Sequence, residues 1–205
     1  MVTISGDDDL TARSAAPSEA RQLVEQVGDA GHVASLIDQI AGSIANGFAD
    51  APNLALIGIR SRGDDLARRL RINLMHRLNS VPQFGSLDIT LYRDDFDSLS
   101  EQPIVGTTEI SFSIDGRVII LVDDVLFTGR TVRAAMDELL DLGRPARIVL
   151  AVLVDRGWHE LPIAADIVGQ TLVTERDDNV QVLLQETDGT DEILLLHGDG
   201  DPGDG

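Results

Sequence analysis

Hydrophobic positions along this chain come in blocks with two different periods. Between Val33 and Phe48 they recur at helical spacing, and Ala51-Pro52-Asn53 ends the pattern. The continuous apolar run 54–59 predicts a buried strand, and the spaced apolar positions of 66–78 predict a second helix. A strand followed by a helix is half of a parallel βαβ unit.

The same order continues downstream. The alternating segment 86–92 predicts a strand, whereas 117–122 and 147–154 are continuous apolar runs, typical of parallel strands covered on both faces. Between those two runs an apolar stripe over 132–140 predicts a helix that ends at Gly143. Alternating strands and helices predict an α/β domain with a parallel, doubly wound sheet flanked by helices.

The chain of 205 residues predicts one domain with an extension at each end. Residues 1–22 are small, polar and acidic and 198–205 are a Gly/Asp tail, so we expect both to be disordered and 23–197 to fold. The stretch from Arg93 to about Thr108 is polar, and we expect it to form a mobile loop.

Composition restricts the chemistry. The net charge is −19, all 16 cationic side chains are arginine, and there is no lysine or cysteine. These absences exclude a Walker A loop, Schiff-base catalysis, a thiolate nucleophile and a disulfide framework. We expect a cytoplasmic protein without DNA or membrane partners, because the start has no signal-peptide pattern and the charge repels polyanions.

The string VIILVDDVLFTGRT, residues 118–131, carries the strongest signal. Asp123 and Asp124 follow a buried strand, and Thr128-Gly129-Arg130-Thr131 opens a helix. Backbone amides at a helix start suit a phosphate monoester, and two carboxylates suit the hydroxyls of a neighbouring sugar. Receiver domains and Walker B strands also place acids after a strand, but those sites depend on lysine. A pair of acids that only caps the turn is the remaining alternative.

The string resembles the phosphoribosyl pyrophosphate (PRPP) motif of type I phosphoribosyltransferases. Together with IGIRSRGDDLARRL, LDITLYRDD and the segment 121–169, it resembles the PyrR family of pyrimidine operon regulators, which are also uracil phosphoribosyltransferases. The resemblance runs from about Val24 to Leu196. It implies a mainly parallel sheet with a small base-binding hood, and transfer of ribosyl 5-phosphate from PRPP to uracil, giving UMP and pyrophosphate with Mg²⁺.

The resemblance also implies roles for single residues. Asp123 and Asp124 would be catalytic and hold the ribose hydroxyls, and the segment from Asp123 to Thr131 would bind the ribose phosphate. Its members are Asp123, Asp124, Val125, Leu126, Phe127, Thr128, Gly129, Arg130 and Thr131. No direct protein ligand to Mg²⁺ is expected, because PRPP itself would hold most of the ion.

Ser61, Arg62 and Gly63 match the family's pyrophosphate loop. Arginine offers a fork to pyrophosphate oxygens and glycine lets backbone approach a ligand, so Arg62 is also a catalytic candidate. For Arg60, a solvated position at the start of a helix is an equally good explanation. Arg93 is a candidate for a contact that closes the mobile loop, and a surface ion pair with Asp94 or Asp97 is nearly as well supported.

The resemblance places uracil beside the loop that follows the strand 147–154, where the base-binding candidates lie. These candidates are Val154, Asp155, Arg156 and Val180. Trp158 is expected at a subunit contact and His159 at the surface.

Two classes of function stay open. One is an enzyme that makes UMP, and the other is a sensor of UMP or PRPP that regulates through RNA or another protein; a phosphoribosyltransferase for another base is a third reading. RNA-binding relatives use a basic face to which the first helix contributes, but here 33–50 contain no Lys or Arg, which makes RNA binding doubtful. We expect a homo-oligomer, at least a dimer.

Overall fold

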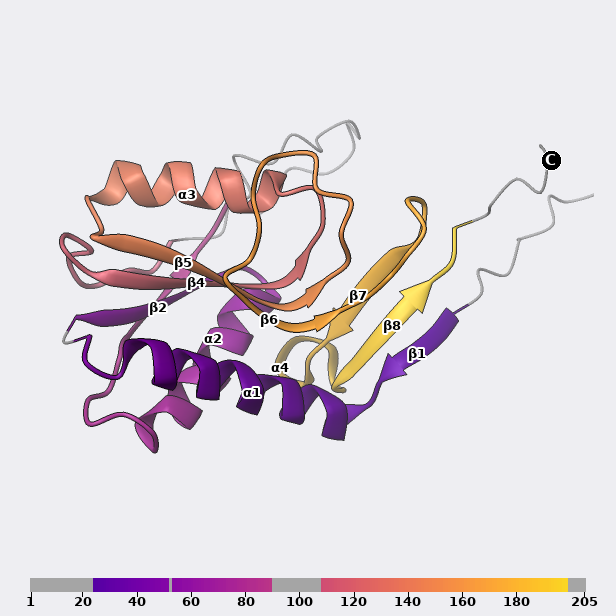
Figure 1. Ribbon diagram of the computed structural model, residues 1–205, viewed down its shortest axis with the longest axis horizontal. Coiled ribbons are helices and arrows are strands. Elements are labelled where there is room, and N and C mark those ends of the chain that lie inside the picture. The colour runs from indigo at the N-terminus through magenta and orange to yellow at the C-terminus, as the bar shows by residue number, and fades with distance from the viewer. Residues whose placement is uncertain (1–23, 52, 90–107, 199–205) are drawn as a thin grey trace, which may run out of the picture.

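The computed structural model describes residues 24–51, 53–89 and 108–198. In this part of the chain a five-stranded parallel sheet has the order β3-β2-β4-β5-β6 (Figure 1). The strands of the parallel sheet are β2 (Leu54–Ile59), β3 (Gln83–Leu87), β4 (Val118–Leu126), β5 (Arg147–Asp155) and β6 (Ile167–Thr171). The predicted α/β class with a doubly wound parallel sheet is confirmed.

Helices cover both faces of this sheet. α1 (Ala30–Phe48) and α2 (Arg62–Met75) pack on one face, and α3 (Arg130–Leu142) packs on the other (Figure 1). Along β2, Leu54 and Leu56 face the helix pair, whereas Ala55 and Ile57 face α3. Alternate side chains of one strand thus enter two separate cores, which is why the strands read as continuous apolar runs.

Three boundaries differ from the prediction. The strand expected at 86–92 is β3, which begins at Gln83 and ends at Leu87, because it pairs with β2 only until Leu87 lies opposite Ile59. β4 continues past the predicted end at 122 to Leu126, since β5 still pairs beside it as far as Asp155. α2 begins at Arg62 instead of at 66, so Arg62 and Gly63 of the expected pyrophosphate loop are already helical.

A second, antiparallel sheet has the order β1-β8-β7 and stands at one end of the molecule (Figure 1). It consists of β1 (Val24–Gly28), β7 (Asn179–Leu183) and β8 (Glu192–Leu196), with α4 (Gln185–Asp188) between β7 and β8. We call these four elements the hood. The resemblance implied a hood, but its elements were not predicted: its strands have five residues each, and β1 pairs with β8 from the other end of the chain.

The expected extension at 1–22, the tail apart from Gly198, and the expected loop 93–108 apart from Thr108 lie outside the described residues. No helix within the described ranges is long and apolar enough to cross a membrane.

Candidate active site

The loop between β4 and α3 forms one wall of a cavity at the carboxyl edge of the sheet. Gly129 has a φ of +89°, a left-handed conformation in which a side chain would be strained. The first backbone bond of α3 runs from the Arg133 N–H to the Gly129 carbonyl at 2.9 Å. The N–H groups of Thr131 and Val132 precede that bond and have no helical carbonyl to bind, so they suit an anion.

Asp123 and Asp124 lie beside this loop at the end of β4. Asp123 is 6% exposed, and its Oδ1 accepts a bond of 3.1 Å from the Asp124 N–H. Burial raises the pKa of Asp124 above its ordinary value, although the Val125 N–H and the charge of Arg62 act in the opposite direction. A buried carboxylate of this kind gains from any donor or cation that a ligand brings.

The loop between β2 and α2 forms the opposite wall and contains Ser61 and Arg62. At Gly63, a Cβ atom would lie 2.5 Å from the carbonyl oxygen of Val122 in β4. Only glycine allows α2 to begin this close to β4, next to Asp123. The sequence predicted that Gly63 lets the backbone approach a ligand, but in the structure the close approach is between the backbones of α2 and β4. Gly63 is not among the residues that line the cavity.

Arg60 and Asp64 support the same loop. Arg60 pairs with Glu109 at 3.0 Å and lies 3.8 Å from Asp64, whose carboxylate also accepts a bond of 3.2 Å from Ser86 Oγ. Burial is the largest cause that raises the pKa of Asp64. The expectation that Arg60 stands at a helix start is not met, because α2 begins two residues later at Arg62, and the half-buried side chain of Arg60 pairs within this cluster.

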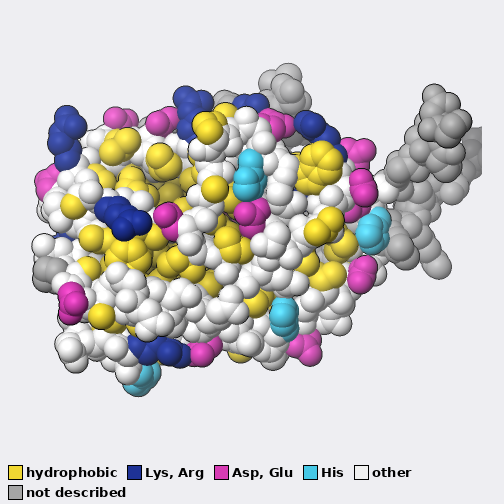
Figure 2. Space-filling view, viewed as in Figure 1, with side chains coloured by type: hydrophobic (Ala, Val, Ile, Leu, Met, Phe, Trp, Pro, Cys, Tyr) yellow, Lys and Arg dark blue, Asp and Glu magenta, His cyan; other side chains and the backbone are white. Residues whose placement is uncertain are grey.

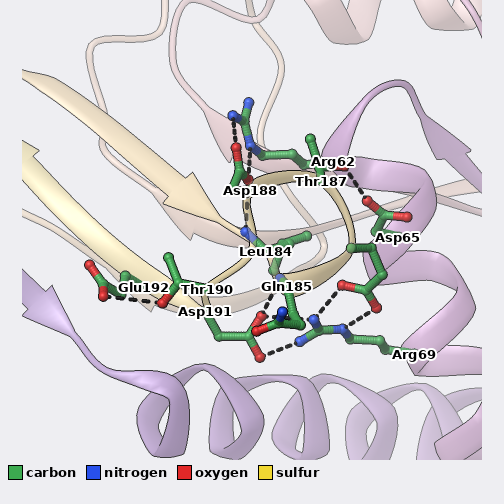
Figure 3. Close-up of polar contacts among 11 residues, drawn as sticks. Arg62, Asp65, Arg69, Leu184, Gln185, Thr187, Asp188, Thr190, Asp191 and Glu192 are labelled. Atoms are coloured by element: carbon green, nitrogen blue, oxygen red, sulfur yellow. Dashed lines mark hydrogen bonds and ion pairs between the residues drawn. The ribbon is translucent and has the colours of Figure 1, made fainter.

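Arg62 connects the loop to the hood. Its Nε and Nη2 donate to the carboxylate of Asp188 at 2.9 and 2.8 Å (Figure 3). This bond to Asp188 is the first cause that raises the pKa of Arg62. Asp188 follows β7 by five positions, and nothing in the sequence near Arg62 indicates the pair.

Arg156 joins the base-side loop to the phosphate loop. It is 4% exposed, its guanidinium lies 4.0 Å from the centre of the Phe127 ring, and its Nη2 donates to the carbonyls of Glu175 and Arg176. Burial lowers the pKa of Arg156. Arg156 therefore lines the cavity, and its buried guanidinium also holds together the loops that form the cavity wall.

The other base-side candidates divide between core and loop. Val154 is fully buried in the core, and Asp155 accepts bonds from the Gly157 N–H at 2.9 Å and pairs with His159 at 3.0 Å. Neither Val154 nor Asp155 lines the cavity. Trp158 is 45% exposed and its indole N–H donates to the carbonyl of Thr174, while the exposed position expected for His159 is confirmed.

These walls enclose a cavity of about 730 Å³. Of the predicted residues, Ser61, Arg62, Arg156, Val180 and the whole segment from Asp123 to Thr131 line it. Arg93 lies outside the described residues. The residues that line it without having been predicted are Arg60, Asp88, Ile89, Val132, Glu160 and Asn179.

Two of the missed residues had a detectable signal. Asp88 follows β3, and Glu160 lies in the loop after β5, so both belong to the carboxyl edge at which ligands bind in such sheets. Asn179 had none, because it enters the cavity from β7 of the hood.

The cavity offers carboxylates rather than a cage of metal ligands. Within the described ranges no group of three or more His, Cys, Asp or Glu side chains could hold a metal ion. Asp123 and Asp124 supply oxygen atoms, which Mg²⁺ prefers, and this ion keeps water and phosphate oxygens as most of its ligands. The donor set therefore fits a Mg²⁺ ion that arrives with a phosphorylated ligand.

The fold and the groups that line the cavity fit a phosphoribosyltransferase. A family model described as the phosphoribosyl transferase domain matches residues 24–186, and the chain belongs to this family. The predicted type I phosphoribosyltransferase fold is thereby confirmed. The prediction that the protein is a pentosyltransferase is confirmed as well.

Two relatives show which members of this family the chain resembles. The chain is 47% identical over 171 residues to the bifunctional protein PyrR of Pelotomaculum thermopropionicum, covering 83% of this chain and 94% of the relative. It is 52% identical over 160 residues to the bifunctional protein PyrR of Deinococcus radiodurans, covering 78% and 87%. The resemblance to the PyrR family is confirmed.

Among solved structures, the hypoxanthine phosphoribosyltransferase of Trypanosoma cruzi is similar with a TM-score of 0.64. It is 19% identical, and the match covers 85% of this chain and 97% of that one. A likeness at this identity establishes the shared fold alone.

Proposed function

We propose that this protein transfers the ribosyl 5-phosphate group of PRPP to uracil, forming UMP and pyrophosphate. The observation that carries the proposal is that one cavity is lined by the N-terminus of a helix suited to bind phosphate, two adjacent carboxylates and an arginine. These groups match the 5-phosphate, the ribose diol and the pyrophosphate of one molecule. The similarity to bifunctional PyrR proteins supports uracil as the base.

In this proposal the chain's own residues mainly bind and orient. Amides of Thr131 and Val132 would hold the 5-phosphate, and Asp123 with Asp124 would accept bonds from the ribose hydroxyls. Arg62 would neutralise charge that develops on the departing pyrophosphate, as an electrostatic group fixed before the reaction begins. Bound Mg²⁺ would supply further neutralisation of that charge.

The base would lie between the loop after β5 and the hood. Arg156, Val180 and Asn179 line this side of the cavity. A buried donor or acceptor left without a partner costs about 1 to 3 kcal/mol, which is enough for a pocket to distinguish uracil from cytosine.

The decisive experiment measures nucleotide formation from PRPP and radiolabelled uracil, hypoxanthine or orotate, with Mg²⁺ and with the metal chelated. We expect UMP from uracil alone and only in the presence of Mg²⁺. Conversion of hypoxanthine or orotate without conversion of uracil would refute the choice of base. Equal turnover after chelation would refute the role of the metal.

Two further expectations belong to the same proposal. A homo-oligomer, at least a dimer, is consistent with the exposed apolar side chains of Ile72 and Met75 on α2, and light scattering after gel filtration measures it. The cytoplasmic location stays a prediction from the sequence.

A further inference from the structure

Asp188 binds one edge of Arg62 and leaves the rest of the guanidinium available. The two bonds use Nε and Nη2, so Nη1 is on the side that faces away from Asp188 (Figure 3). A guanidinium has five N–H donors, of which these bonds occupy two. Arg62 also lines the cavity, so three donors remain for a ligand there.

The carboxylate of Asp188 is itself fixed by its own short helix. Its Oδ2, which accepts from Arg62 Nε, also accepts a bond of 2.8 Å from the Leu184 N–H. The backbone of Asp188 is held by a bond from its N–H to the Leu184 carbonyl, and Gly189 ends α4 with a φ of +79°. The acceptor is therefore held in place independently of Arg62.

Without Asp188, Arg62 would have other acidic partners. Asp124 and Asp65 are the further carboxylates whose charges raise the pKa of Arg62. Asp124 lines the same cavity. An arginine drawn to Asp124 would occupy the carboxylate that the proposed ribose needs, and it would use N–H donors that the pyrophosphate needs. The pair with Asp188 thus keeps the guanidinium away from the acidic end of β4.

The hood does not depend on Asp188 for its attachment to α2. Arg69 binds Glu186 and Asp191, and Thr187 Oγ1 donates to Asp65 Oδ2 at 2.7 Å (Figure 3). These contacts join the same two elements without touching Arg62. Asp188 is distinguished from its neighbours by its contact with a residue of the cavity.

We propose that Asp188, from the hood, is a positioning residue that sets the orientation of Arg62 for binding of the pyrophosphate group of PRPP. This inference rests on the function proposed above. It predicts that loss of Asp188 weakens use of PRPP and leaves use of the base unchanged.

The test compares Asp188→Asn with Thr187→Val by steady-state kinetics and thermal unfolding. An asparagine oxygen can still accept from the Leu184 N–H, while its amide group opposes Arg62 Nη2. We expect kcat/KM for PRPP to fall about tenfold in Asp188→Asn, the size of a weakened charge-assisted bond, with the KM for uracil unchanged. Thr187→Val, which breaks only the adjacent α4–α2 bond, should keep both constants.

A double-mutant cycle separates positioning from general support of the fold. In an Arg62→Ala background, Asp188→Asn should cause no further loss of kcat/KM for PRPP, because a residue that acts through Arg62 has nothing left to orient. Additive losses would overturn the proposal, as would equal losses in Asp188→Asn and Thr187→Val. Should Asp188→Asn fail to fold, Asp188→Glu, which keeps the charge but displaces the carboxylate, makes the same comparison.

Direct titration of the wild-type protein with PRPP and Mg²⁺ separates this inference from the function on which it rests. If the wild type does not bind PRPP, the proposed function is overturned and the inference with it. If the wild type binds PRPP and makes UMP while Asp188→Asn behaves like the wild type, only the positioning role is overturned.

Discussion

The guanidinium of Arg156 lies 4.0 Å from the centre of the Phe127 ring, which joins the loop after β5 to the loop after β4. Arg156 also donates to the carbonyls of Glu175 and Arg176, so one side chain connects both loops with the segment that leads to the hood. A planar cation stacked on an aromatic ring in a buried place has no equivalent in lysine.

Arg156→Lys is therefore expected to lower the free energy of unfolding by about 2 kcal/mol, because the ammonium loses the planar stacking on the ring and weakens the bonds to the two carbonyls. Phe127→Leu should lower it by a similar amount, about 2 kcal/mol, because it removes a desolvated cation–π contact although the bonds of Arg156 to the carbonyls stay. Urea unfolding of both variants and of the double variant measures the coupling. Strictly additive effects would show that the two side chains do not support each other.

Gly129→Ala tests the phosphate loop, with Gly116→Ala as its matched control. Both glycines have positive φ, +89° and +66°, but Gly116 lies away from the cavity, and a Cβ there would have open space around it. Each substitution should destabilise the protein by about 1 kcal/mol through backbone strain. Only Gly129→Ala should weaken PRPP binding, measured by titration calorimetry; the same loss in both variants would contradict the role of this loop.

Asp124→Asn should make the ligand-free protein more stable and the enzyme less active. Burial raises the pKa of this carboxyl, so the folded state disfavours the ionised side chain, and a neutral amide removes that cost while Oδ1 can still accept from the Val125 N–H. We expect the unfolding midpoint to rise by a few degrees while UMP formation falls about a hundredfold. A variant of unchanged activity would remove Asp124 from the site.

Acid should loosen the hood before the parallel sheet. Bonds from Arg62 lower the pKa of Asp188, and bonds from Arg69 lower those of Glu186 and Asp191, below ordinary values of 3.8 for Asp and 4.5 for Glu. A depressed pKa gives stability that is present above the ordinary value and is lost as the pH falls through the folded-state value.

Asp64 and Asp124 have raised pKa values, so the folded core disfavours their ionised forms. Their protonation relieves this cost as the pH falls from neutral through their folded-state pKa values. Hydrogen exchange measured at neutral pH and below about pH 4 should therefore show protection lost in β7 and β8 and kept in β4 and β5. Simultaneous loss in both sheets would contradict this order.

RNA binding should be weak at physiological salt. α1 has no Lys or Arg within its bounds, and the arginines on the face seen in Figure 2 are scattered among acidic and uncharged side chains. Each missing phosphate contact removes roughly one counterion from the binding equilibrium, and a net charge of −19 opposes the rest. A gel-shift titration against the leader of the protein's own pyrimidine operon tests this, and tight binding at physiological salt would restore the regulatory hypothesis.

Much of the site could be predicted because its chemistry is contiguous in the chain. Asp123 to Thr131 pass from a buried strand through a turn into a helix, and the apolar run before them specifies where the strand lies. The resemblance implied a hood, but its elements were not predicted, because its five-residue strands carry little periodic signal. Gly63 was expected at the pyrophosphate, and the structure shows why glycine is needed there, since a Cβ atom would meet β4.

By itself, the sequence determined the α/β class, the succession of strands and helices from β2 to β5, and the loop suited to a phosphate, because each depends on neighbours within one or two elements. Only the tertiary structure decided which distant side chains meet: Arg62 and Asp188 are 126 positions apart, and Phe127 and Arg156 directly follow the neighbouring strands β4 and β5. The first pair depends on where the hood packs against α2 and the second on the pairing of β4 with β5, and no local pattern of polar and apolar residues encodes either.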